Sequence, residues 1–229
     1  MNTLSSRLLA AALAAAALSA TAPAAAQAQA EGAFAQLYAP RPPAGSSFVR
    51  VVNPGTAPIK VKLASGPEQE IGPKQRASSY AIVKGGQSFE IRIDGKVAGS
   101  LQVQPDSFNT LVPTPGAAQP FKALDDSNGN QDALKAEIRF YNLAQDCPAG
   151  SLTVANGPTL FADVAPASAK ARAINPVTAS LMATCGQAVT AAWPLPALQP
   201  GDHYSLFLTG SAASPQLSGQ TGQTDPYTR

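Results

Sequence analysis

One sequence pattern occurs twice in this chain, about ninety residues apart. Each copy has a mostly apolar run that ends in Asn, then an aliphatic residue two positions before a Pro, and later a turn ahead of an aromatic residue. The segments are residues 48–53, 71–73 and 105–108 in the first copy and residues 137–142, 164–166 and 200–204 in the second. A repeat of this length predicts two similar small modules in tandem.

The local patterns favour strands over helices. Residues 59–63 and 89–93 alternate apolar and charged side chains, which is typical of a strand with one buried face. The 21 Pro and 18 Gly leave few stretches long enough for a helix, because both residue types weaken its hydrogen-bond ladder. We therefore predict an all-β protein of two tandem antiparallel β-sandwiches, Ig-like or jelly-roll-like, with about seven strands in each.

Composition sets the expected boundaries. The first sandwich is predicted at residues 31–112 and the second at 135–229. Residues 113–134, rich in Pro, Gly, Asp and Asn, are predicted to form a short linker. The chain becomes polar from about residue 210, and we expect this tail to fray except for a short edge strand around Leu217.

Residues 1–30 have the composition of a cleavable signal peptide. Arg7 precedes an Ala- and Leu-rich stretch, and small residues around 26–30 offer a cleavage site. The apolar stretch is shorter than the roughly 20 residues of a membrane-spanning helix. The sequence therefore predicts an exported protein.

The cysteines and the net charge narrow the range of functional classes to which the protein could belong. Cys147 and Cys185 are the only two cysteines, and in an exported protein such a pair is best interpreted as one disulfide. The formal net charge is only +2, without the dense basic face of a nucleic-acid-binding protein. The chain has a single His with no cluster of ligand residues around it in the sequence, so we expect no metal site. It also lacks a glycine-rich nucleotide-binding motif, so we expect no cofactor.

A search for catalytic residues finds little. His203, the single His, lies in a Pro-Gly-Asp turn that leads into a strand, and the first copy of the repeat has no His at this place. No Gly-x-Ser-x-Gly motif accompanies it. Among the acids, Asp125 and Asp126 are neighbours but fall in the predicted linker, where a rigid catalytic geometry is hard to hold. We expect docking surfaces rather than a catalytic cleft.

Aromatic side chains can stack on sugar rings, and two of them lie beside prolines. Trp193 precedes Pro194, and Tyr38 lies near Pro40. They are the candidate glycan contacts, although burial within the fold is the competing interpretation for aromatic residues in strands.

An ordered set of short motifs resembles the alginate O-acetylation accessory protein family AlgF. The motifs are Leu-Tyr-Ala-Pro at 37–40, Gly-Ser-Ser-Phe-Val-Arg-Val-Val-Asn at 45–53, Pro-Phe at 120–121, Ile-Arg-Phe-Tyr-Asn at 138–142, Ile-Asn-Pro-Val at 174–177 and Leu-Phe-Leu-Thr-Gly at 206–210. The chain departs from the family pattern in its cysteine pair, its longer linker and its polar tail.

The resemblance implies a periplasmic, non-enzymatic adaptor in the O-acetylation of an exopolysaccharide. The implied polymer is alginate, with acetylated cellulose as the second candidate. The implied partners are periplasmic SGNH-like O-acetyltransferases and a membrane-bound O-acyltransferase, which the adaptor would bridge. Two alternatives stay open, namely a carbohydrate-binding module that contacts the polymer directly and an acyl-transfer or hydrolytic enzyme that uses His203.

Overall fold

The computed structural model describes residues 41–127, 132 and 134–227, and all regular elements in this part of the chain are strands. The first eight are β1 (Ser46–Val51), β2 (Ile59–Leu63), β3 (Gln69–Ile71), β4 (Ala81–Lys84), β5 (Ser88–Ile93), β6 (Lys96–Gln102), β7 (Phe108–Pro113) and β8 (Phe121–Asp125). The others are β9 (Ala136–Asn142), β10 (Gly150–Val154), β11 (Thr159–Val164), β12 (Ser168–Ile174), β13 (Ser180–Cys185), β14 (Ala188–Val189), β15 (Trp193–Pro194), β16 (His203–Gly210) and β17 (Pro215–Thr221). In this described part no helix is long and apolar enough to span a bilayer.

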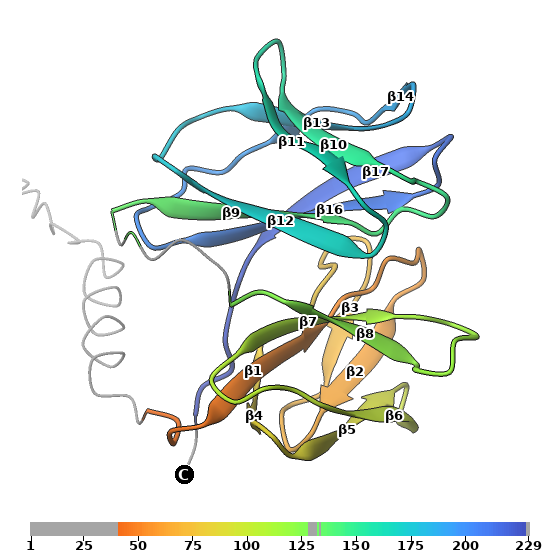
Figure 1. The fold of residues 1–229 in the computed structure, drawn as a ribbon, viewed down its shortest axis with the longest axis vertical. Coiled ribbons are helices and arrows are strands. Elements are labelled where there is room, and N and C mark those ends of the chain that lie inside the picture. The colour runs from red at the N-terminus through yellow and green to blue at the C-terminus, as the bar shows by residue number, and fades with distance from the viewer. Residues whose placement is uncertain (1–40, 128–131, 133, 228–229) are drawn as a thin grey trace, which may run out of the picture. The chain divides into compact units, whose positions relative to one another are not determined.

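The strands form four sheets, and the second pair of sheets repeats the order of the first pair (Figure 1). The first half contains sheets of order β4-β1-β7-β8 and β3-β2-β5-β6. The second half contains β12-β9-β16-β17 and β11-β10-β13-β14, and β15 adds to β13. In both halves the first strand pairs antiparallel on one side and parallel on the other, as β1 does with β4 and β7 and β9 does with β12 and β16. The sequence repeat is therefore a repeat of topology.

Each half has its own hydrophobic core, which the alternation of side chains along the strands produces. In the first half Val49, Val51 and Ile91 are fully buried in one cluster. In the second half Ile138, Phe140 and Leu206 are fully buried in another. Because successive side chains in a strand point to opposite faces, the intervening residues of β1 and β9 lie on the faces away from these cores.

A third hydrophobic cluster joins the two halves. It contains Val52 and Val112 from the first half and Tyr141 and Phe207 from the second, and all four are at most 5% exposed. Strand β9 is consequently buried along its whole length, with one face in its own core and the other at this junction. Both halves therefore belong to a single compact unit of the chain.

The shared topology of the two copies explains the Asn that ends each repeated run. Asn53 Nδ2 donates hydrogen bonds to the carbonyls of Ala57 and Ile71. Asn142 Nδ2 donates in the same way to the carbonyls of Cys147 and Val164. In each half the amide therefore ties the end of the first strand to the end of the third strand, β3 or β11, which belongs to the other sheet.

Three expectations from the sequence need correction. The segment 113–134, expected as a linker, contains β8, which pairs with β7 from Asn109 to Pro113. The tail after residue 210 does not fray in its described part, because β17 pairs with β16 over seven residues. Within the described residues the first half has eight strands and the second has nine, because β15 adds to β13, rather than about seven in each.

Beyond β17 the chain returns to the first half (Figure 1). The N–H of Tyr80 donates to the carbonyl of Gln223, and the N–H of Asp225 donates to the carbonyl of Tyr80. Gln220 both donates to and accepts from the backbone of Ala77. This C-terminal strap, residues 220–225, therefore fastens the second half to the first.

The disulfide predicted between Cys147 and Cys185 is confirmed. Its Cα atoms are 5.7 Å apart, and both cysteines are buried in the core of the second half. The bond links the turn before β10 to the end of β13, where Gly150 and Cys185 are cross-strand partners.

Candidate functional site

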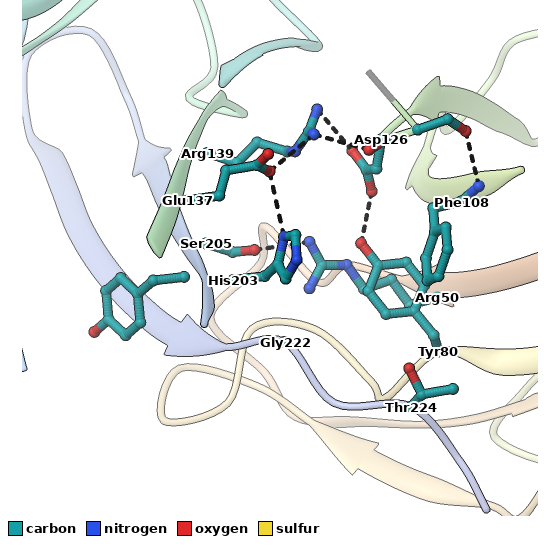
Figure 2. Close-up of a pocket in the computed structure, with 12 residues that line it drawn as sticks. Arg50, Tyr80, Phe108, Asp126, Glu137, Arg139, His203, Ser205, Gly222 and Thr224 are labelled. Carbon is teal, nitrogen blue, oxygen red and sulfur yellow. Dashed lines mark hydrogen bonds and ion pairs between the residues drawn. The ribbon is translucent and has the colours of Figure 1, made fainter. Parts of the chain in front are cut away.

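A pocket of about 310 Å³ lies where the two halves meet, and both halves line it (Figure 2). The first half contributes Arg50, Tyr80, Phe108, Asp126 and Ser127, and the second contributes Glu137, Arg139, His203, Tyr204, Ser205, Gly222 and Thr224. The sequence predicted no such pocket, because the pocket exists only when the two halves are packed together.

The polar side chains point toward this pocket because side chains alternate between the two faces of a strand. Arg50 lies between Val49 and Val51, which point into the core of the first half. Glu137 and Arg139 flank Ile138 on β9, and the parallel register places Glu137 beside His203 and Arg139 beside Ser205. Polar groups from β1, β9 and β16 are thus brought to one place.

Arg50 is the most deeply buried charge of the pocket, at 1% exposure. Its Nε donates to Thr110 Oγ1 at 2.8 Å, and its Nη2 donates to Tyr141 Oη and Ser205 Oγ, both at 2.8 Å. The guanidinium also lies 4.5 Å from the centre of the Tyr80 ring, close enough for a cation–π contact. Burial alone would lower the pKa of Arg50, but attraction by Tyr141, Tyr80 and Asp126 outweighs it and raises the pKa, so Arg50 is charged.

The Asp126 carboxylate accepts hydrogen bonds from the hydroxyl groups around Arg50. It accepts hydrogen bonds from Tyr80 Oη at 2.8 Å, from Thr110 Oγ1 at 2.5 Å and from Tyr141 Oη at 2.8 Å. The side chain is 3% exposed. Since Thr110 and Tyr141 also accept from Arg50, two hydroxyl groups connect the guanidinium to the carboxylate. Burial raises the pKa of Tyr141 to about 12 and also raises the pKa of Tyr80, so both tyrosines stay neutral donors at physiological pH.

Glu137, Arg139 and His203 form the second charged group (Figure 2). Arg139 Nη2 donates to Glu137 Oε1 at 3.0 Å and to the carbonyl of Asp126 at 2.8 Å, while Nη1 lies 3.7 Å from Asp126 Oδ1. His203 Nδ1 lies 3.6 Å from Glu137 Oε1, and its side chain is 62% exposed. Attraction to the Glu137 carboxylate raises the pKa of His203 against the opposing effect of burial.

The arrangement holds charge and polar groups but shows no activated nucleophile among the described residues. Ser205 shares a face with His203 on β16, yet its hydroxyl accepts from Arg50. The Ser127 hydroxyl accepts from the N–H of Phe108. In the described ranges no three His, Cys, Asp or Glu side chains are grouped so that they could hold a metal ion.

The structure places the residues singled out from the sequence in different surroundings. His203, interpreted as a turn residue, begins β16 and lies at the pocket. Asp126, assigned to a linker, is a buried hub of the network. Trp193 is half-buried against the core of the second half, and its indole N–H donates to Tyr204 Oη at 3.0 Å. Tyr38 and residues 1–30, the predicted signal peptide, lie outside the described residues.

Sequence reasoning missed Arg50, Arg139 and Tyr141 because charged and polar residues in an alternating strand are normally assigned to solvent. One signal was present. Arg50 and Arg139 occupy the same position in the two copies of the repeat, three residues before the Asn. The positions that flank Arg50 are apolar on both faces, whereas one same-face neighbour of Arg139 is Glu137. A strand that is apolar on both faces is buried on both faces, and an Arg within it needs partners.

Comparison with known proteins assigns the chain to a family. The family model described as "Alginate O-acetyl transferase AlgF" matches residues 15–205. The alginate biosynthesis protein AlgF of Pseudomonas aeruginosa is 32% identical over 192 residues, which cover 79% of each chain. The AlgF protein of Pseudomonas putida is 29% identical over 181 residues, which cover 79% of this chain and 80% of the relative.

Among solved structures, the C-terminal domain of AlgF from Pseudomonas aeruginosa is similar at 30% identity and a TM-score of 0.33. The match covers 38% of this chain and 98% of that domain. Because the family model matches well over half of the sequence, the chain belongs to the AlgF family, whose name connects it with alginate O-acetylation.

Proposed function

We propose that this protein is a periplasmic, non-enzymatic adaptor in the O-acetylation of alginate. Its partners in this proposal are periplasmic SGNH-like O-acetyltransferases and a membrane-bound O-acyltransferase. Family membership supports the pathway. The observation that carries the adaptor role is the way in which the two halves are joined.

In this proposal each half is a β-sandwich module that offers its own surface to a partner. The repeated sheet order and the separate core of each half support the modular interpretation. The third hydrophobic cluster, the Arg50 network and the C-terminal strap join the modules. A joined pair of surfaces can hold two partners close together and raise the effective concentration of one for the other.

The outer sheets supply surfaces that differ in charge. On the first half, β2 and β5 expose Lys60, Lys62 and Arg92, together with Glu90, which pairs with Arg92. On the second half, β10 and β13 present the small polar groups Ser151, Thr153 and Thr184, which are partly exposed. Two chemically different faces are suited to two different partners.

The test is reconstitution of the complex with purified partners. The mature protein should co-purify with a periplasmic acetyltransferase and with the membrane-bound acyltransferase, and acetylation of polymer should fall when it is omitted. Lys60→Glu together with Lys62→Glu should weaken capture of one partner and leave the other unchanged. Ser151→Ala with Thr153→Ala is the matched change on the opposite module. Partners that assemble and acetylate at the normal rate without this protein would refute the adaptor role.

One observation favours a second function, acyl transfer or ester hydrolysis at His203. The pair formed by His203 Nδ1 and Glu137 Oε1, 3.6 Å apart at the pocket, resembles the base and orienting carboxylate of hydrolytic enzymes. This function predicts turnover of an acetyl ester by the purified protein, and loss of that turnover in His203→Ala. Unchanged turnover in the variant would dismiss it.

A further inference from the structure

Arg50 has an unusual environment for a buried charge. Arginine is rarely fully buried unless a carboxylate pairs with it. Arg50 is 1% exposed and charged, but among the described residues it makes no direct ion pair. Its contacts are hydroxyl groups and aromatic rings, and Asp126 is reached only through Thr110 and Tyr141.

One edge of the guanidinium borders the pocket and makes no hydrogen bond to the described residues. Nε and Nη2 of Arg50 make all of its hydrogen bonds, which leaves Nη1 without a partner among the described residues. The polar atoms in this part of the chain that are both fully buried and without a partner belong to other residues, namely Arg76, Asn142, Thr209, Ser218 and Asp225. Nη1 of Arg50 is therefore not fully enclosed by protein. Because Arg50 lines the pocket, Nη1 is the guanidinium nitrogen that is left to donate to a ligand there.

The rest of the lining suits a small polar ligand with one negative charge. Arg50 and Arg139 contribute two positive charges, and Asp126 and Glu137 contribute two negative ones, so the lining is neutral when His203 is neutral and carries +1 when His203 is protonated. Phe108, 36% exposed, offers an apolar surface. A volume of about 310 Å³ is at the lower limit of small-molecule sites.

We propose that this pocket binds a small monocarboxylate, the size of a short-chain acid or a single sugar acid, through Arg50 Nη1. The carboxylate supplies the direct ion pair that Arg50 lacks, and a guanidinium is the side chain best matched to a planar carboxylate. A phosphate dianion is disfavoured because Asp126 and Glu137 lie in the same lining. This site is independent of the adaptor role and does not require catalysis.

The experiment is titration of the ¹⁵N-labelled mature protein with acetate and, separately, with D-glucuronate, followed by amide chemical shifts. Saturable shifts at pocket residues with either acid support the site, and the acid that binds more tightly identifies the source of the carboxylate. Methyl glucoside, which has no charge, should not shift these amides. Inorganic phosphate should bind at least several-fold more weakly than the better acid.

Two variants make the test specific. Arg50→Gln should weaken binding about tenfold or more, because it removes a charge-assisted hydrogen bond. His203→Gln, an exposed change that the fold tolerates, should weaken binding several-fold at pH 6 even if Arg50→Gln fails to fold. Arg92→Gln is the matched control on the outer sheet and should bind like the unmodified protein. Absence of saturable shifts at pocket amides with both acids, or equal binding by Arg92→Gln and His203→Gln, would overturn the proposal.

Discussion

Tyr141→Phe is the most informative single change at the junction. It removes one oxygen atom and keeps the ring, so the hydrophobic packing against Phe207 is retained. The lost hydroxyl accepts from Arg50 Nη2 and donates to Asp126 Oδ1, each at 2.8 Å. The change therefore tests the polar network separately from the apolar cluster.

The structure gives the expected size of the effect. A hydrogen bond to a charged group contributes about 1.5–3 kcal/mol, and two are lost here. Arg50 Nη2 keeps its bond to Ser205, and Asp126 keeps Tyr80 and Thr110, so the full sum is not expected. We predict a loss of about 2–4 kcal/mol in the free energy of unfolding, which is a large part of the roughly 5–15 kcal/mol of an ordinary protein.

The assay is equilibrium unfolding in urea, with near-UV circular dichroism and intrinsic fluorescence as separate probes. Two other tyrosines provide matched controls. Tyr204→Phe removes a hydroxyl that accepts from the half-buried Trp193 and should cost about 1 kcal/mol. Tyr227→Phe changes a partly exposed residue outside the strands and should cost less than about 0.5 kcal/mol. A Tyr141→Phe loss no larger than that of Tyr227→Phe would refute the structural role of the network.

Three further predictions concern other features. Reduction of the Cys147–Cys185 disulfide should lower the free energy of unfolding by about 4 kcal/mol, measured in urea with and without reductant, and an unchanged midpoint would contradict this. The folded pKa of His203 is raised above its unfolded value, so the stabilising contribution of His203 is complete below the unfolded pKa and is lost as pH rises through the folded pKa. Urea midpoints measured across this pH range should decline accordingly. The decline should be smaller in His203→Gln. Deletion of residues 222–229 removes both backbone hydrogen bonds to Tyr80. The Tyr80 amide should therefore exchange with deuterium much faster than in the full-length protein, while the exchange rate of the Ile138 amide should change less. An unchanged Tyr80 exchange rate would argue against the strap.

The strands were largely predictable because their periodicity is local. Residues 59–63 and 89–93 alternate cleanly and form β2 and β5 close to the expected positions. β8 was missed because its two buried residues, Phe121 and Leu124, are three positions apart and follow a Pro- and Gly-containing turn. β17 was underestimated because most of its residues are Gly, Ser, Gln and Thr, and its pairing with β16 decides its structure.

The pocket was not predictable in the same way. Its charged residues come from β1, from the segment after β8, and from β9 and β16, and each looks like an ordinary surface residue in its own segment. Tyr80, Phe108 and the segment after β17 complete the lining. Only the packing of one module on the other buries Arg50 and brings Asp126 to Tyr141. The equal positions of Arg50 and Arg139 in the repeat were the available clue, and their chemical meaning required the parallel register of β9 and β16.

The central claim is that the junction holds the two modules in a fixed relation, as an adaptor with two partner surfaces requires. Residual dipolar couplings from backbone amides of a protein that comprises residues 31–229 test this directly. We predict that couplings from β1–β8 and from β9–β17 fit one common alignment tensor. Two clearly different tensors would show that the modules move independently, and they would contradict the account.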